Sequence, residues 1–436
     1  MRHLVRMTML GCVCGCFLLL PRLLHAGGPW FVDEKGSGVP YTWAGGTIIW
    51  YADAGGLGAF SGAEIIDQVK KAFDVWMNAG LHLPGMVKVN TVQVSAVLGG
   101  ILKEKLTPEN LMKHLNKTLI IYDEDGSILT GEGVNPQDVA AVTFLGAKMD
   151  PTTLHHLAGV TVLNGLFLQD VDPANPGGSK YARFLATLVH EFGHLFNLDH
   201  SALNWENINE IVSDIGAFGK ALPTMYPVIV EGGGQETLHV DDVVAISTLY
   251  PRADFTSKFC AFAGVLVGSD SLGFQGAHVV ARPVKDPMTF AISAVSGNAL
   301  PQGAADGSYI VRGILPGEKY TLSYGKINPA FVMESSLQPY GDEEGETPRS
   351  GFENAPITAG NGKATTVLCN APGETVMMDT IQLEIPSGGT FQAKNPLVSA
   401  STPMAPPATA TGGSPGGDPE TKAGAKKTFG CTFVLP

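Results

Sequence analysis

The stretch Leu188–His200, LVHEFGHLFNLDH, decides how this sequence folds around a site. His190 and His194 are four residues apart, a little over one helical turn, so both imidazoles project from one face of a helix. Glu191 follows the first histidine, which places its carboxylate beside a shared ion rather than on it. Histidines are typical zinc ligands, and a neighbouring carboxylate can move protons. The stretch therefore predicts a metal centre on a helix.

A third ligand is expected from His200, six residues beyond His194. In a continuing helix this side chain would point away from the other two, so the helix must end and the chain must turn back. Asn197 stands at the turn, and asparagine is one of the few residues other than glycine that enters the left-handed region at modest cost. We predict that Asn197 stops the helix. The next residues, Leu198 and Asp199, would then carry the chain round to His200.

The surrounding sequence predicts an α+β region over residues 46–254. TIIWYAD (Thr47–Asp53) is rich in β-branched and aromatic residues, as strands are. Ser61 and Glu64 form a capping box before a helical apolar pattern that stops at Gly80. Further strands are expected in TLIIYDEDGS, AAVTFLG and GVTVLNGLFL, and a long helix from about Lys180 to Phe196.

The histidine pattern, read together with three other segments, resembles that of the metzincin zinc peptidases, with Asn197 in place of their usual glycine. LPTMYP (Leu222–Pro227) is similar to the methionine turn of the matrixin branch. AFDVWMNAG is similar to the first matrixin helix, and LHVDDVVAISTLYP to the last one, which Asp241 or Asp242 would cap. The segment between His200 and Met225 is much longer than in vertebrate matrixins, so we expect a reshaped cleft there.

This resemblance implies a twisted mixed β-sheet, a long active-site helix and a C-terminal helix. It implies one catalytic zinc ion on His190, His194 and His200, with Met225 as an apolar floor. Glu191 would be the general base and then the general acid of an exported zinc metalloendopeptidase. A protein or peptide substrate would lie extended along an edge strand, such as one within residues 141–168.

The alternative is a non-catalytic surface adhesin or structural protein that uses the same fold for binding. The intact Glu191 argues against this reading. Upstream cysteines all lie within residues 1–26, so we do not expect latency by the family's thiol–zinc route.

Other candidate ligands lie outside the motif. DEDG and DVD offer clustered carboxylates that could bind Ca²⁺, and turn-forming aspartate and glycine explain the same letters equally well. The four carboxylates are those of Asp123, Asp125, Asp170 and Asp172. His155-His156 could suggest a second zinc ion, but without spaced partners we interpret the pair as ordinary polar residues.

Residues 259–386 alternate short β patterns with Gly and Pro turns and predict an all-β sandwich. ADGSYIVRGILPGEKYTLSY resembles the carboxypeptidase-regulatory-like modules of the transthyretin type, in which Ser308–Gly313 and Tyr320–Tyr324 would be paired strands around Pro316-Gly317. The resemblance indicates no ligand. Cys260 and Cys369 flank the region and are the candidate disulfide pair, with two buried free thiols as the alternative.

The two ends carry different signals. A basic start, an apolar run and Leu24-His25-Ala26 predict a signal peptide over residues 1–26, and hence a secreted, periplasmic or cell-surface protein. A lead-in segment, 27–45, follows. Residues 393–421 form a Pro/Ala/Thr/Gly-rich linker, and 422–436 a short tail with Cys431. The Cys431 thiol could be an attachment point, could form an intermolecular disulfide, or could be a free thiol without a role.

Composition limits the partners. Of 436 residues, 44% are hydrophobic and 16% charged, which favours folded domains, and the net charge of −13 argues against nucleic acid and anionic membrane surfaces. No segment after the signal is long and apolar enough to span a bilayer, and we expect a monomer.

Overall fold

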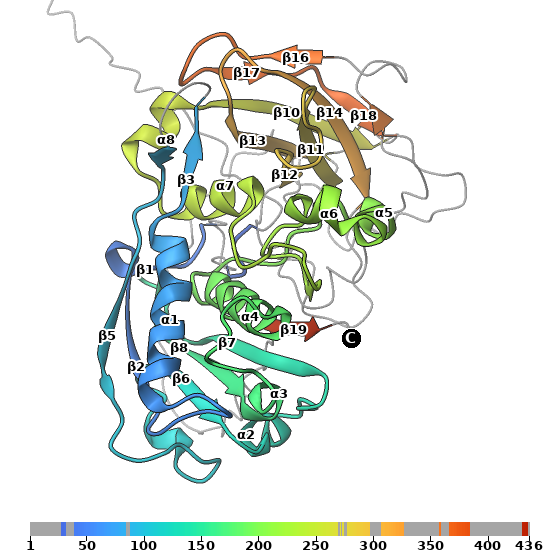
Figure 1. The fold of residues 1–436 in the computed structure, drawn as a ribbon. Coiled ribbons are helices and arrows are strands. Elements are labelled where there is room, and N and C mark those ends of the chain that lie inside the picture. The colour runs from blue at the N-terminus through green and yellow to red at the C-terminus, as the bar shows by residue number, and fades with distance from the viewer. Residues whose placement is uncertain are drawn as a thin grey trace, which may run out of the picture.

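The computed structural model describes residues 28–31, 39–83, 88–268, 271, 273, 277–296, 307–326, 357–358, 366–383 and 430–434. These ranges contain helices, strands and several sheets, which is compatible with the α+β class (Figure 1). None of the described helices is long and apolar enough to cross a membrane. The predicted signal peptide and the 393–421 linker lie outside the described residues.

A mixed eight-stranded sheet organises the first part of the chain. Its order is β5-β2-β6-β8-β7-β19-β9, with β1 paired to β8. Strands β2, β5, β6 and β8 run parallel, and β7 runs antiparallel to β8. Its strands are β1 (Thr42–Trp43), β2 (Thr47–Ala52), β5 (Ser95–Ile101), β6 (Thr118–Asp123), β7 (Val139–Asp150), β8 (His155–Asn164), β9 (Val228–Ile229) and β19 (Gly430–Val434). A separate pair joins β3 (Gly80–His82) to β4 (Lys88–Asn90).

Two long helices pack together against this sheet. Helix α1 (Gly62–Met77) begins with the predicted capping box of Ser61 and Glu64, and α4 (Ser179–Leu195) covers nearly all of the predicted range. Phe73 of α1 stacks on Phe192 of α4 with ring centroids 4.0 Å apart. The indole N–H of Trp76 donates to the carbonyl of Val189 at 2.8 Å. Helix α4 is thus fixed in the core from one side.

Short helices fill the connections. They are α2 (Ser127–Gly131), α3 (Gly165–Leu168), α5 (Ile208–Ser213), α6 (Ile215–Phe218), α7 (Val240–Leu249) and α8 (Ala253–Lys258), with 3₁₀ turns at Ala44–Gly46, Leu111–Lys113, Trp205–Asn207 and Gly219–Ala221. The strand expected in GVTVLNGLFL ends at Asn164, because that side chain caps α3 by accepting from the N–H of Leu166. The expectation that Asp241 or Asp242 caps α7 is wrong: the N-cap is His239, and Asp242 occupies the third helical position of its capping box.

The second part of the chain forms two sheets that face each other (Figure 1). In one, β10 (Cys260–Gly268) pairs with β13 (Ser308–Ile314), β17 (Thr375–Met377) and β18 (Ile381–Leu383). The other has the order β12-β11-β14-β15, with β16 on β14; its strands are β11 (Ala277–Pro283), β12 (Ile292–Val295), β14 (Lys319–Lys326), β15 (Ile357–Thr358) and β16 (Thr366–Leu368). Phe262 of β10 meets Tyr320 of β14 edge to face, 5.7 Å between centroids.

The expected pairing of Ser308–Gly313 with Tyr320–Tyr324 is wrong. Strand β13 pairs with β10, and β14 pairs with β11 in the opposite sheet. The turn between them is present, with Gly317 at a φ of 78°. It crosses from one sheet to the other, and a turn signal alone does not say whether the strands it joins are neighbours.

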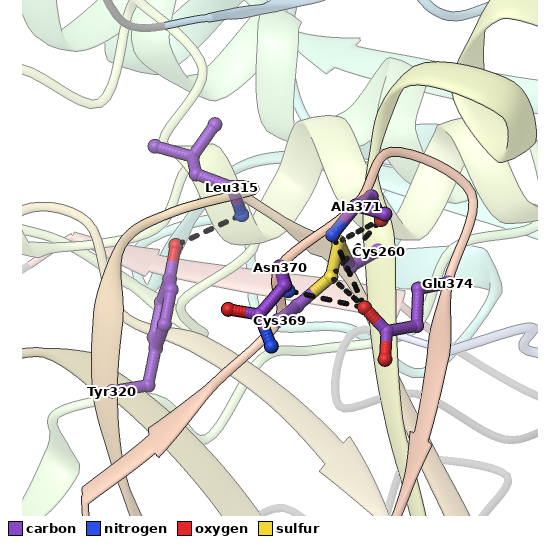
Figure 2. The surroundings of a disulfide bond; sticks show 7 residues. All are labelled: Cys260, Leu315, Tyr320, Cys369, Asn370, Ala371 and Glu374. Atoms are coloured by element: carbon purple, nitrogen blue, oxygen red, sulfur yellow. Dashed lines mark hydrogen bonds between the residues drawn. A yellow bond between two sulfur atoms is a disulfide. The ribbon is translucent and has the colours of Figure 1, made fainter.

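A disulfide joins Cys260 to Cys369 across a sequence separation of 109 residues. Cys260 begins β10, and Cys369 follows β16 of the other sheet, so the bond ties the two sheets together. Figure 2 shows the turn beside it, where the Glu374 carboxylate accepts from the N–H groups of Asn370 and Ala371, each at 3.1 Å. The pair is the one that the sequence singled out, and neither thiol is free.

Candidate metal centre

His190, His194 and His200 meet in the interior, and one ring nitrogen of each lies within 4.8 Å of the other two. Among the described residues, this is the group of histidine, cysteine and acidic side chains close enough to hold a metal ion. The Nε2 atoms of His194 and His200 are 3.2 Å apart. Two nitrogens bound to one zinc ion at 2.0–2.1 Å in tetrahedral geometry are separated by about 3.3 Å. The triad is therefore positioned to bind a metal ion.

Hydrogen bonds to backbone carbonyls orient two of the rings. His190 Nδ1 lies 2.7 Å from the carbonyl of Thr224, and His194 Nδ1 lies 2.8 Å from that of Leu198. A carbonyl only accepts, so each Nδ1 carries the proton and each Nε2 presents a lone pair. The Nε2 of His190 is buried and has no hydrogen-bond partner, which is unusual for a buried polar atom and fits a metal ligand.

Burial keeps the three rings in the neutral form that binds metals. It lowers the pKa of His190 to about 4. For His194 and His200, burial comes first and repulsion from neighbouring histidines second, and the pKa of each lies well below its usual value. At neutral pH no proton has to leave these rings before they ligate.

Asn197 ends α4 in the left-handed conformation, with a φ of 72°. Its N–H donates to the carbonyl of His194, and the N–H of Leu198 donates to that of Gly193, at 2.8 and 2.9 Å. This pair of bonds is the Schellman motif, which turns the chain sharply at a helix end. The turn brings His200 back beside His194.

The side chain of Asn197 also does what glycine could not do. Its Oδ1 accepts from the N–H of Phe31, and its Nδ2 donates to the carbonyls of Phe31 and Tyr41, all within 2.9 Å. The N–H of Trp30 donates to the Asn197 carbonyl, and the Trp30 ring lies 5.1 Å from that of His194. The described part of the lead-in segment is therefore bound onto the ligand turn, an interaction that the sequence did not indicate.

Met225 lies fully buried next to α4. A β-carbon at Gly193 would collide with the Met225 sulfur and with the Trp76 ring. Only glycine leaves room for both at this helical position. Helix α4, the Leu222–Pro227 turn and α1 thus meet at one close contact.

Two buried carboxylates at the start of α7 hold the loops around the triad. Asp242 accepts from the N–H groups of Thr224 and Met225, at 2.7 and 3.0 Å, and so fixes the carbonyl that orients His190. Asp241 accepts from the hydroxyl of Ser201, next to His200, at 2.6 Å. Burial raises the pKa of Asp241 to about 7 and that of Asp242 to about 6.

Asp241 also joins the triad to the second part of the chain. Its carboxylate accepts from the backbone N–H of Ser293 in β12 at 2.7 Å and from the Ser293 hydroxyl at 3.0 Å. One buried carboxylate therefore contacts both the loop after His200 and a strand of the facing sheets. The sequence suggested Asp241 only as a helix cap, because a contact over 52 residues has no local signal.

The long segment between His200 and Met225 packs against the same sheets. The Arg282 guanidinium of β11 donates to Asn204 Oδ1 at 2.6 Å, and Asn204 Nδ2 donates to the carbonyls of Ala221 and Met288. Apolar side chains close the interface; the cluster contains Ala202, Ile211, Ala221, Leu222, Tyr226, Val230 and Val295. This segment thus connects the loop that carries His200 to the second part of the chain.

Glu191 is fully buried and follows His190 on α4. Its backbone carbonyl accepts from the hydroxyl of Thr143 in β7 at 3.0 Å. This contact aligns β7, one of the strands within the range expected to bind substrate, with the part of α4 that carries the motif.

The remaining candidates have local partners. Asp123 accepts from the N–H groups of Ile128 and Leu129 and so caps α2, and Asp125 accepts from the N–H of Ser127. Asp170 pairs with Lys180 at 3.4 Å, and Asp172 accepts from the N–H of Ala174 at 2.9 Å. The contacts of Asp123, Asp125 and Asp172 are the turn and capping contacts of the simpler interpretation, whereas Asp170 forms an exposed ion pair. Calcium binding stays a prediction.

His155 and His156 are adjacent in β8, so their side chains point to opposite faces of the sheet. His155 Nδ1 lies 3.2 Å from the carbonyl of Thr42. His156 is buried among the rings of Phe31, Tyr41 and Trp43, with centroids 5.6–6.0 Å away. These surroundings are those of a core histidine.

Comparison with models of protein families gave no match, and comparison with curated proteins gave none either. Among solved structures, one similar chain is described as the dioxygenase domain of a dioxygenase carbohydrate-binding protein fusion from the cellulolytic bacterium Streptomyces sp. SirexAA-E. It is 13% identical with a TM-score of 0.17, and the match covers 31% of this chain and 84% of that chain. A TM-score this low does not indicate a shared fold, so the function is inferred from the geometry of the site.

Proposed function

We propose that the chain is a zinc-dependent endopeptidase of the metzincin class, similar to the matrixins. The observation that carries the proposal is the triad: three buried imidazoles converge, and hydrogen bonds from Nδ1 leave the Nε2 atoms of His190 and His194 as ligands. The left-handed Asn197 turn and the Met225 floor support the same class.

The donor set favours zinc. Three neutral imidazoles with a second shell of backbone carbonyls are a common catalytic zinc environment, and no soft thiolate or hard carboxylate belongs to the group among the described residues. Zinc held in this way supplies Lewis acidity and an open coordination position.

The residues of the chain supply the proton transfer and the orientation. Glu191 is the general base that takes a proton from the attacking water, and then the general acid that gives it to the leaving amine. Its place on α4, one residue after His190, keeps it beside the metal in a buried site where charge interactions are strong. Asp242 and the Thr224 carbonyl hold the His190 ring in position.

Purified protein freed of its predicted signal peptide tests this proposal. We expect close to one zinc ion per chain and cleavage of an unstructured protein. Removal of the metal by a chelator should abolish cleavage, and zinc should restore it. Stoichiometric zinc without cleavage of any protein or peptide would favour the non-catalytic alternative.

A further inference from the structure

Strand β19 brings the C-terminal end of the sequence to the candidate site. This strand, drawn in red in Figure 1, lies between β7 and β9 and next to α4. Against β7 it runs antiparallel, with Gly430 opposite Thr143, Cys431 opposite Val142 and Phe433 opposite Val139. Against β9 it runs parallel, with Phe433 opposite Val228 and Val434 opposite Ile229.

The two neighbours of β19 flank the metal centre. The residue opposite Gly430 is Thr143, whose hydroxyl bonds to the Glu191 carbonyl of α4. On the other side, β9 begins three residues after Met225. Strand β19 therefore lies next to α4, between β7 and β9, and without it one side of β7 would be an edge of the sheet.

Strand β19 differs from the other strands of this sheet in how it is reached. The next described strand before it, β18, ends at Leu383 in the second part of the chain, and the predicted linker 393–421 lies between them. Because β19 lies near the C-terminal end of the sequence, far from the strands it pairs with, it can dissociate without unfolding them.

We propose that residues 430–434 occupy the side of β7 where an extended peptide would pair, so that the chain competes with substrate for its own cleft and slows cleavage until this segment is displaced or cut. The inference rests on the proposed peptidase function for its consequence, because strand addition is how an extended substrate would bind. The pairing itself does not depend on that function.

A disulfide trap tests the pairing without any catalytic readout. Directly opposed residues of an antiparallel pair have Cα atoms about 4.5–5.5 Å apart, within the range that a disulfide spans. In Val142→Cys, mild oxidation should link position 142 to the native Cys431, as mapped by mass spectrometry of the intact chain's peptides. The same variant with Cys431→Ser should give no link at this position. Absence of the 142–431 link in the first variant overturns the proposal.

Activity then tests the blocking. Phe433 pairs with both neighbours, and proline there removes the backbone N–H and does not fit between two strands. We expect full-length Phe433→Pro to cleave a peptide at least several-fold faster than wild type. The control Thr411→Pro, in the Pro-rich linker, should match wild type. Oxidised Val142→Cys should be slower than its reduced form.

The two failures are distinguishable. If Phe433→Pro cleaves no faster than wild type although both are active, the strand does not block the cleft and the proposal is wrong. If no form cleaves anything, the peptidase function fails, while the 142–431 link still reports whether the segment occupies the edge of β7.

Discussion

The side-chain oxygen of Asn197 accepts a hydrogen bond from the backbone N–H of Phe31, 166 residues earlier, at 2.8 Å. The bond joins the lead-in segment to the turn that positions His200. Asn197 therefore has two separable tasks, a left-handed backbone and a set of hydrogen bonds.

Substitutions at Asn197 should separate these tasks. Asn197→Gly keeps the backbone conformation but removes the acceptor of the Phe31 N–H and a donor to the Phe31 and Tyr41 carbonyls, and we expect a loss of ~1–3 kcal/mol in unfolding free energy. Asn197→Ala loses the same bonds and, unlike the glycine variant, keeps a β-carbon in the left-handed region, so it should be about 1 kcal/mol less stable than Asn197→Gly. Denaturant unfolding measures both, and a glycine variant as stable as wild type would show that the side-chain bonds contribute nothing.

Gly193 should be intolerant of the smallest side chain. A methyl group there meets the Met225 sulfur and the Trp76 ring, so Gly193→Ala should destabilise by ~1–3 kcal/mol and weaken zinc binding. The matched control is Gly131→Ala at the end of α2, where a β-carbon has open space. Unfolding and metal content of the two variants, measured in parallel, check this. Equal stability and equal zinc content in the two variants would contradict the close packing around Gly193.

The disulfide should stabilise the second part of the chain. Removing it by Cys260→Ser with Cys369→Ser should lower the unfolding free energy by ~2–5 kcal/mol, because a crosslink across 109 residues restricts the unfolded chain strongly. Reduced wild type should unfold at the same denaturant concentration as the double variant. An unchanged midpoint in both would show that the bond does not limit unfolding.

Asp241 should make stability depend on pH. Burial raises the pKa of its carboxyl in the folded chain, from 3.8 to about 7, so the folded state holds the proton more tightly than the unfolded state. Its contribution to stability is then full below pH 3.8 and declines as the pH rises toward about 7. A tenfold difference in proton affinity corresponds to ~1.4 kcal/mol, which is measurable.

The test compares wild type with Asp241→Asn in unfolding experiments from pH 4 to 8. The stability of wild type relative to the variant should fall with rising pH over this window. Asp67→Asn, an exposed aspartate on α1, should follow wild type throughout. Parallel pH profiles of wild type and Asp241→Asn would mean that the Asp241 carboxyl has the same proton affinity in both states.

Local features could be predicted from the sequence because they depend on nearby residues. The capping box of Ser61 and Glu64 and the extent of α4 follow from side-chain spacing and helix-end chemistry. The left-handed backbone at Asn197 is a property of one residue type at one turn. The meeting of the three histidines could be predicted from a helix and the turn at Asn197 alone.

The features that were missed depend on distant parts of the chain. Pairing of β13 with β10 instead of β14 is decided by the packing of two sheets, and no turn signal encodes it. The contact of Asp241 with Ser293 links two parts of the chain, and β19 reaches β7 from nearly 290 residues away. Such contacts leave almost no signal in the residues around either partner. The sequence therefore pointed to these residues without indicating what they contact.

The proposed endopeptidase function is tested most directly by Glu191→Gln, which keeps the size of the side chain and removes its ability to accept the proton. Zinc content, the fold and the rate of cleavage of an unstructured protein should be measured on this variant and on wild type together. The account predicts one zinc ion per chain in both, the same unfolding midpoint within experimental scatter, and a rate at least about 100-fold lower in the variant. A variant that retains zinc and cleaves as fast as wild type would contradict it.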